Sequence, residues 1–355
     1  MKLLIDIGHP GHVHLFKNFA GEFIKKNHHI LFTCREKEFE IELLKHEGFE
    51  FVSFGKKYQS TLGKIIGLLK FDFLMLKTAL KFKPDLFLSH GSPYAAHAAF
   101  LTGRVNIALE DTGNNEQVRL YLPFTKHVLT STSFHKNYGS KQVFYNAFHE
   151  LAYLHPKRFN ADDSVLNELG FNSNTKFFFL RFISWNASHD VGEGGLNLKE
   201  KIELVNYLNT FGKVIISSEK ELPTELKPFQ LKINPAKVHH VMHFATLFVG
   251  EGATMASECA MLGTPAIYIN SMNSGTINEQ EKAGLLYHFK TGSGVMNKVK
   301  ELLADNNLKG NTLVKRNHFL KNKIDLSSFL VWFLENYPAS SDVLKNNPDY
   351  QLRFQ

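Results

Sequence analysis

The 355-residue sequence has only two cysteines, Cys34 and Cys259, which lie far apart and form no CxxC pair. This spacing excludes a disulfide framework and a cysteine-based zinc ribbon, and we expect both thiols to be buried. The sequence also lacks an apolar run of the roughly 20 residues needed to cross a bilayer, and its first residues lack a signal-peptide pattern. We therefore expect a cytoplasmic protein.

Zinc-finger spacing, an aromatic RNA-binding signature and a low-complexity basic tail are absent as well, so we expect no nucleic-acid partner. The formal charge of +7 nevertheless favours an anionic partner, such as a nucleotide or a membrane surface. Between residues 55 and 84, lysines alternate with apolar residues. This basic amphipathic pattern is typical of contact with an anionic membrane, and equally of ordinary helices packed on a sheet.

Short apolar runs alternate with helical patterns along the chain, for example at 2–7, 29–34, 176–180 and 213–217. Continuous apolar strands with helices between them indicate an α/β fold with parallel sheets covered on both faces. The pattern restarts after a connector, which predicts domains at 1–160 and 161–355, with the option that the last helix packs back on the first domain. Doubly wound sheets bind ligands beyond the carboxyl ends of their strands, so two facing domains predict a cleft.

A glycine loop with three histidines follows the first predicted strand, Gly8-His9-Pro10-Gly11-His12-Val13-His14, and leads into a helix. The glycines allow the backbone to approach a ligand, and unpaired N–H groups at a helix start attract an anion or an electron-rich oxygen. The histidines add proton chemistry. A tight turn with exposed imidazoles is the alternative.

The same histidines could form a metal site in a hydrolase, with His90, Glu110 and Asp111 as further ligands. However, the loop runs into a helix, which would separate His9 from His14 in direction. We therefore expect no metal.

A second glycine loop, Gly252-Ala253-Thr254-Met255-Ala256-Ser257-Glu258, opens a helix after a buried strand. Its first N–H groups would hold a diphosphate, and Glu258 would accept hydrogen bonds from both hydroxyls of a ribose. An ordinary helix start with a dipole-stabilising glutamate is the alternative. Neither loop is a Walker sequence or a complete GxGxxG, which disfavours a P-loop kinase and a dehydrogenase.

The segment after the first strand of the second domain offers Arg181 for a phosphate, and Ser184 and Asn186 for uracil or phosphate oxygens.

Four motifs resemble those of the glycosyltransferases that add N-acetylglucosamine to the lipid-linked peptidoglycan precursor. They are Ile7 to Val13, Gly252 to Glu258, Gly263-Thr264-Pro265 and Glu281-Lys282-Ala283-Gly284. The resemblance implies a GT-B fold of two doubly wound Rossmann-like domains and a UDP-sugar as substrate. It places His12 at that family's loop histidine and Glu258 at its ribose-binding glutamate.

Residues 84–92 and 109–116 are similar to the non-hydrolysing UDP-N-acetylglucosamine 2-epimerases, which share this fold. Glu110 and Glu116 match acidic positions of those enzymes, whereas Ser92 stands where they carry an aspartate. The whole chain is most similar to a bacterial and archaeal family of unknown function in the same superfamily.

These features predict an inverting, metal-independent glycosyltransferase that uses a UDP-sugar, without a cofactor, in surface polysaccharide or glycolipid synthesis. We expect His12 to be the base, and the Gly252 loop with Arg181 to hold the departing diphosphate. The acceptor would be a glycan or a lipid-linked molecule, with peripheral contact to the inner membrane surface as an option. The alternatives are a UDP-sugar 2-epimerase, with proton work by Glu110 and Glu116, and a non-catalytic nucleotide-sugar binding protein. The predicted substrate-binding residues are Gly8, Gly11, His14, Ser92, Arg181, Ser184, Asn186, Gly252, Ala253, Thr254, Met255, Glu258 and Gln280.

Overall fold

The computed structural model describes residues 1–355 except 57, 59, 184–194 and 219. It divides into two compact units, the first formed by Met1–Arg158 with Asn322–Gln355 and the second by Phe159–Lys321. Each unit is built on one all-parallel sheet with helices between the strands. The predicted fold class, α/β with two doubly wound Rossmann-like domains of the GT-B type, is confirmed.

The first unit holds a seven-stranded sheet in the order β3-β2-β1-β4-β5-β6-β7. Most of its strands are buried, as continuous apolar runs between two helical layers require, whereas the edge strand β3 is partly exposed. The strand order reverses between β1 and β4, and the crevice at such a switch point is where open α/β sheets bind ligands. The strands are β1 (Lys2–Ile7), β2 (His29–Glu36), β3 (Phe51–Lys56), β4 (Leu86–His90), β5 (Val105–Glu110), β6 (His127–Ser131) and β7 (Gln142–Tyr145).

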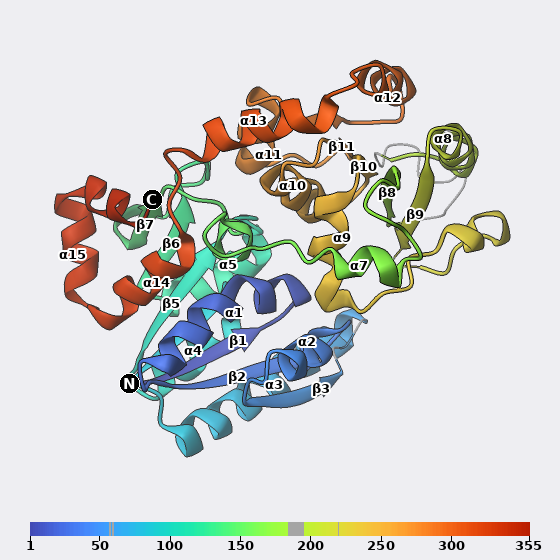
Figure 1. The fold of residues 1–355 in the computed structure, drawn as a ribbon. Helices are drawn as coiled ribbons and strands as arrows, with labels where there is room; N and C mark the ends of the chain where they lie inside the picture. The colour runs from blue at the N-terminus through green and yellow to red at the C-terminus, as the bar shows by residue number, and fades with distance from the viewer. Residues whose placement is uncertain (57, 59, 184–194, 219) are drawn as a thin grey trace. The chain divides into compact units, whose positions relative to one another are not determined.

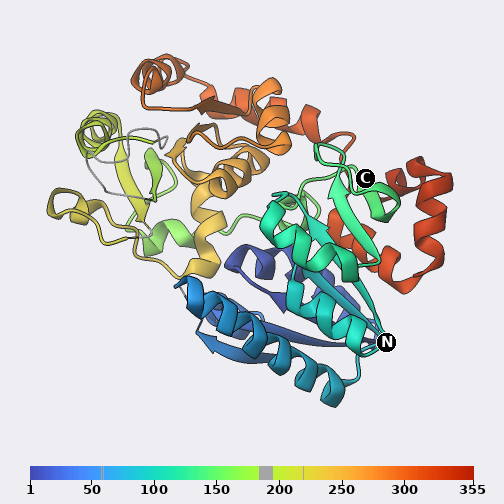
Figure 2. The ribbon, with the colours of Figure 1, turned by 180° about the vertical axis from the view of Figure 1, so that it is seen from behind.

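Helices cover both faces of this sheet, and Figures 1 and 2 show the two layers from opposite sides. In one layer α1 packs against α2, α6 and α14, while in the other α4 packs against α3 and α5. The chain thus returns to the first unit after residue 321. The helices are α1 (Pro10–Lys25), α2 (Glu40–His46), α3 (Thr61–Phe82), α4 (Pro93–Leu101), α5 (Asn115–Tyr121), α6 (Leu151–Leu154), α14 (Leu326–Glu335) and α15 (Ala339–Asn346), with short 3-10 helices η1 (Leu122–Phe124), η2 (Gly139–Lys141) and η5 (Pro348–Phe354).

The second unit holds a five-stranded sheet in the order β12-β11-β10-β8-β9, so its switch point lies between β8 and β10. Its core includes Phe178, Leu180, Leu204 and Val249. The strands are β8 (Phe177–Phe182), β9 (Lys213–Ser218), β10 (Leu247–Gly250), β11 (Ala266–Ile269) and β12 (Leu286–Phe289). The helices are α7 (Ser164–Glu168), α8 (Leu198–Asn209), α9 (Val238–Phe244), α10 (Ala253–Leu262), α11 (Gly275–Lys282), α12 (Val295–Leu303) and α13 (Leu308–Leu320), with η3 (Thr224–Phe229) and η4 (Pro235–Lys237).

Both cysteines are buried and unpaired, as predicted. Within the described residues, no helix combines the length and the apolar character that crossing a bilayer requires.

Helix α3 carries two apolar stripes. Phe71 and Met75 are buried in the core of the first unit. Ile66, Leu69, Phe73 and Leu80 lie on the other side and are 53–69% exposed. Exposed lysines stand among them, namely Lys70, Lys77 and Lys81. The helix therefore has a basic, apolar outer face.

Candidate active site

The loop after β1 is organised by its own histidines. The Gly8 N–H donates to His12 Nδ1 at 3.2 Å, and His9 caps α1 by accepting the Gly11 N–H at its Nδ1, at 3.1 Å. A Cβ on Gly8 would lie 3.1 Å from Arg35 Nη2, and one on Gly11 would lie 3.2 Å from His9 Nδ1. The close packing of these groups explains the glycines.

A buried ion pair lies beneath this loop. Arg35 Nη1 is 2.5 and 2.7 Å from the two carboxylate oxygens of Asp6, and the Thr33 hydroxyl donates to the same carboxylate at 2.7 Å. The Arg35 guanidinium also lies over the Tyr94 ring, 4.8 Å from its centroid. Because buried charges are tolerated only when they are paired and hydrogen-bonded, this arrangement is a fixed support for the loop.

Four titratable side chains meet at the carboxyl edge of the first sheet. His90 ends β4, Asp111 follows β5, and His149 follows β7. Asp111 Oδ1 lies 2.9 Å from His90 Nε2, and its Oδ2 lies 3.1 Å from His149 Nδ1. The His12 ring stacks on the His90 ring with centroids 4.5 Å apart. We call these four residues the histidine cluster, and it occupies the switch point between β1 and β4.

The charges in the histidine cluster follow from its contacts. Burial alone would lower the pKa of His90, but the carboxylates of Asp111 and Glu110 raise it to about 9. Partial burial would raise the pKa of Asp111, but His149 and His90 hold it well below its usual range. Burial, followed by the charge of His90, lowers the pKa of His12 well below 6.5. At neutral pH the cluster therefore combines a carboxylate, a cationic His90 and a neutral His12.

The hydrogen bond from Gly8 fixes the tautomer of neutral His12. A backbone N–H can only donate, so His12 Nδ1 is the acceptor and Nε2 carries the proton. In this state Nε2 is a hydrogen-bond donor. The predicted role of His12 as a base would require Nδ1 to leave Gly8.

Glu110 is fully engaged within the first unit. One carboxylate oxygen accepts the N–H groups of residues 111–113 and the Thr112 hydroxyl at 2.8–3.1 Å, and the other accepts the Tyr121 hydroxyl at 2.6 Å. Burial would raise the pKa of Glu110, but His90 and these hydrogen bonds lower it. Glu110 thereby fixes the backbone that carries Asp111.

Three other predicted residues of the first unit lie outside the histidine cluster. Glu116 is exposed in the first turn of α5. Ser92 is buried and caps α4 by accepting the Ala95 N–H at 3.3 Å. His14 is buried in α1, where its ring centroid lies 5.5 Å from that of Tyr153.

Among the described residues, His90, Asp111 and His149 form a group that could hold a metal ion, because their ligand atoms all lie within 4.8 Å of one another. The alternative set drawn from the first loop does not come together in this way, since His9 caps α1 and His14 is buried beside Tyr153. His149 is not among the metal ligands that the sequence suggested.

The switch point of the second sheet combines a helix start with a cation. Gly252 is the N-cap of α10, and among the described residues no side chain forms a cap hydrogen bond with that helix. The Arg181 side chain passes beside Gly252, whose Cβ would lie 3.7 Å from Arg181 Cγ. Arg181 Nη1 also donates to the Ser217 hydroxyl at 2.8 Å. Ala253 and Met255 are half-buried and Thr254 is exposed, so this helix start is accessible within its unit.

Glu251 stabilises the same edge from below. It accepts the N–H groups of Ile183 and Leu196 at 2.8 and 3.1 Å, and it pairs with the buried Lys201 ammonium at 2.8 Å. Glu251 therefore fixes the backbone at Ile183 and at Leu196. The predicted residues Ser184 and Asn186 belong to the segment 184–194 and lie outside the described residues.

The remaining predicted residues of the second unit have internal partners. Glu258 is buried, with Oε1 3.0 Å from His239 Nε2. Gln280 is buried too and donates its amide N–H to the Ser257 hydroxyl at 2.6 Å. Their roles in binding a nucleotide-sugar stay predictions.

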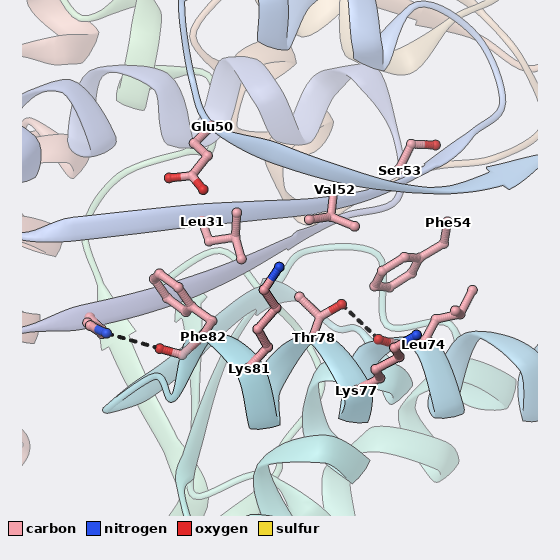
Figure 3. A pocket seen from close by; sticks show the side chains of 11 residues that line it. Leu31, Glu50, Val52, Ser53, Phe54, Leu74, Lys77, Thr78, Lys81 and Phe82 are labelled. Atoms are coloured by element: carbon pink, nitrogen blue, oxygen red, sulfur yellow. Dashed lines mark hydrogen bonds between the residues drawn. The ribbon is translucent and has the colours of Figure 1, made fainter.

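A separate pocket of about 430 Å³ lies between β2, β3 and α3. Figure 3 shows Lys81 extending from α3 toward Leu31 and Val52 on the strands. Lys2 also lines the pocket and donates to the Phe82 carbonyl at 3.3 Å. Lys2 begins β1, whereas the histidine cluster lies beyond the carboxyl ends of the strands, so the pocket is distinct from the candidate active site.

The structure is similar to those of three solved proteins whose identity to this chain is 13–16%. The first is a UDP-GlcNAc 2-epimerase from Neisseria meningitidis bound to UDP-GlcNAc (TM-score 0.67, 13% identity, covering 95% of this chain and 100% of that one). The second is the Methanocaldococcus jannaschii UDP-GlcNAc 2-epimerase in complex with UDP-GlcNAc and UDP (TM-score 0.60, 15% identity, covering 89% of this chain and 99% of that one). The third is MurG from Acinetobacter baumannii (TM-score 0.56, 16% identity, covering 94% of this chain and 99% of that one).

At this level of identity these similarities show the fold alone, and it is the GT-B-type fold that the sequence predicts. No curated protein sequence matches the chain. A family model matches residues 1–325, so the chain belongs to the family described as "protein of unknown function (DUF354)".

Proposed function

We propose that this protein is a glycosyltransferase that takes its sugar from a UDP-sugar, holds the nucleotide on the second unit and handles the proton of the acceptor on the first. The observation that carries the proposal is the histidine cluster at the switch point of the first sheet. Similar structures that contain UDP-GlcNAc support the choice of ligand class.

The donor would bind at the start of α10. The uncapped N–H groups of this helix and its dipole favour the diphosphate, and Arg181 beside Gly252 would add a positive charge. Glu258, one turn into the helix, would accept the ribose hydroxyls. These contacts hold the diphosphate without a metal ion.

The acceptor would react beside the histidine cluster. Transfer of a sugar requires a group that takes the proton of the attacking hydroxyl. Asp111 is a carboxylate with a 40% exposed side chain, and it is held between two imidazoles. His12 would donate from Nε2 to an oxygen of the bound substrate. We therefore propose Asp111 as the proton acceptor and His12 as the donor.

A second candidate function is UDP-sugar 2-epimerisation. The residues that resemble the epimerases come together here, since a Cβ on Gly91 would lie 3.3 Å from Glu110 Oε2 and His90 lies at the same edge. Against it, Ser92 serves as a helix cap, and Glu110 is buried with both oxygens hydrogen-bonded, whereas the Asp111 carboxylate is open to solvent.

The deciding experiment incubates the protein with UDP-GlcNAc in deuterated water and follows the C2 proton by NMR. Loss of that proton signal without an acceptor would identify an epimerase. Release of UDP only after lipid extracts or glycan fragments are added supports the transferase. Tight binding with neither reaction would identify a binding protein.

We also propose that the outer face of α3 contacts an anionic membrane, which would bring the enzyme to a lipid-linked acceptor. Its exposed apolar side chains and lysines suit the interface of such a bilayer. Co-sedimentation with anionic but not neutral vesicles, lost in Phe73→Glu, would support this contact. Equal sedimentation of wild type and variant would contradict it.

A further inference from the structure

Three side chains of the histidine cluster present ligand atoms to one small volume. The ring nitrogens of His90 and His149 and a carboxylate oxygen of Asp111 lie within 4.8 Å of one another. Two imidazoles with one carboxylate are a ligand set that zinc and other divalent transition metals take in sites that keep a position open for substrate. We infer that His90, Asp111 and His149 bind a divalent transition-metal ion, with Zn²⁺ as the ion that this set favours.

The three ligands are held in place before any ion binds, and an ion would displace the proton that His90 carries at neutral pH. Glu110 accepts the N–H of Asp111 and fixes the backbone that carries it. The side chains of His90 and His149 are only 12% and 10% exposed, and their rings meet edge to face with centroids 5.1 Å apart. A rigid ligand set loses little conformational freedom on binding, which favours affinity.

The burial of the ligands is uneven, and this leaves one side of the site open. The two imidazoles are enclosed by the first unit, whereas 40% of the Asp111 side chain is exposed. An oxygen from outside the protein can therefore approach on the carboxylate side. This asymmetry is expected of a catalytic metal site, whereas a structural zinc site has four protein ligands and is closed.

The role that we assign to the ion in catalysis rests on the proposed transferase function. A divalent ion lowers the pKa of a bound oxygen acid, so an acceptor hydroxyl on the metal would lose its proton more readily. The bond between that oxygen and its proton breaks, and the Asp111 oxygen that does not bind the ion takes the proton. The acceptor oxygen then forms a bond to the anomeric carbon of the sugar, while the bond from that carbon to the diphosphate oxygen breaks and UDP leaves with its electron pair. The metal would thus serve the acceptor, while the diphosphate stays on α10 and Arg181.

The first test measures metal binding by the full-length protein, without substrate. After dialysis against a chelator and its removal, ZnSO4 is titrated by calorimetry, and bound zinc is counted by elemental analysis. We expect one zinc per chain. Co²⁺ in its place should give visible absorption bands whose intensity reports four or five ligands. Zinc binding that is absent, or weaker than about 10 µM in the folded wild type, would overturn the inference.

Two variants and a matched control locate the site. Asp111→Asn and His149→Gln should each weaken zinc binding by more than about 100-fold, beyond the usual effect of changing an outer-shell partner. His97→Gln is the control, because His97 also pairs with an aspartate, Asp72 at 3.0 Å, but belongs to no metal-ligating group among the described residues. Undiminished zinc binding in both folded variants would contradict the assignment, and either variant alone suffices if the other does not fold.

The fate of this inference can be separated from that of the proposed function. UDP affinity, measured in EDTA, should be the same in wild type and His149→Gln because the nucleotide contacts lie in the second unit. Zinc binding without any binding of UDP would leave the metal site standing and refute the transferase. UDP-dependent transfer by a protein that binds no zinc would leave the transferase standing and refute the metal site, and transfer that survives complete removal of metal would refute the role of the ion in the reaction.

Discussion

The two switch points of this protein share a topology but carry opposite chemistry. Between β1 and β4, the first sheet presents titratable side chains, with His12 stacked on His90 and Asp111 beside it. Between β8 and β10, the second sheet presents a glycine at a bare helix start, with Arg181 next to it. One edge is suited to moving protons and the other to holding an anion. The proposed function divides the reaction in the same way, with the proton handled at the first edge and the diphosphate held at the second.

Both edges nevertheless rest on a buried ion pair. Asp6 and Arg35 lie beneath the Gly8 loop, and Glu251 and Lys201 lie beneath the Gly252 loop. In each pair the carboxylate also accepts hydrogen bonds from neighbouring groups, which is what makes a buried charge tolerable. The two edges therefore differ in the groups that they expose, but each is supported by a buried, hydrogen-bonded ion pair.

Replacing His12 should have the largest effect on turnover. It also tests whether the proton is handled at the first edge and the nucleotide is held at the second. His12→Ala should lower kcat by roughly 10²- to 10⁴-fold with UDP affinity nearly unchanged, because the proposed nucleotide contacts lie in the other unit. His12→Gln sharpens the test. An amide can donate as Nε2 does but cannot serve as a base, so substantial recovery of kcat would identify a donor. Parallel loss of UDP affinity would contradict the division.

Glu251→Ala tests the pair beneath the second edge. It leaves the Lys201 ammonium buried without its carboxylate and releases the N–H groups of Ile183 and Leu196, so the free energy of unfolding should fall by about 3–5 kcal/mol. Urea unfolding followed by circular dichroism measures the change.

The matched control for Glu251→Ala lies on the same helix as Lys201. Lys199 and Glu203 form an exposed pair on α8, 3.9 Å apart, and Glu203→Ala should cost at most about 1 kcal/mol. Equal losses for the buried and exposed pairs would mean that burial does not decide these energies.

The sheets and the first loop could be predicted from the sequence because their signals are local. The apolar run 2–7 coincides with β1, and the run 213–217 lies within β9, Lys213–Ser218. The two switch points depend instead on strand order, which spacing along the chain does not fix. His149 follows β7, yet it meets Asp111 from β5, so no local motif marks the contact.

The sequence also could not predict which glutamates have buried hydrogen-bond or ion-pair partners. Glu110 and Glu258 match positions of known families, but only the structure places Tyr121 and His239 against them. Glu251 differs from a surface glutamate only through its burial with Lys201, which a one-dimensional pattern does not reveal. Patterns thus locate the site, and long-range packing decides which of its groups are free to react.

Glu258→Gln should give the next effect, and it tests whether the second edge holds the nucleotide. Loss of a charged acceptor for the ribose hydroxyls should weaken UDP binding by about 1.5–3 kcal/mol in calorimetry. Gln keeps the size of the side chain and an oxygen that faces His239, which favours a folded variant. The control, Glu116→Gln, changes an exposed glutamate of the first unit and should leave UDP affinity as in wild type. Unchanged affinity in folded Glu258→Gln would refute the ribose contact.

Ser92 should give the smallest effect, and it distinguishes a structural cap from a group that stands in for the epimerase aspartate. Ser92→Ala removes the acceptor of the Ala95 N–H and should lower the free energy of unfolding by about 1 kcal/mol, with little change in turnover. Ser92→Asp keeps an N-cap acceptor and adds a charge that the helix dipole favours, so it should retain more stability than the alanine variant. Because it also restores the aspartate that the epimerases carry, UDP-GlcNAc in deuterated water is the revealing assay. A transferase should show no deuterium at C2 in either the wild type or Ser92→Asp, since Glu110 remains engaged by its hydrogen bonds. Exchange that appears in Ser92→Asp alone would show that the first edge is an epimerase site lacking one carboxylate.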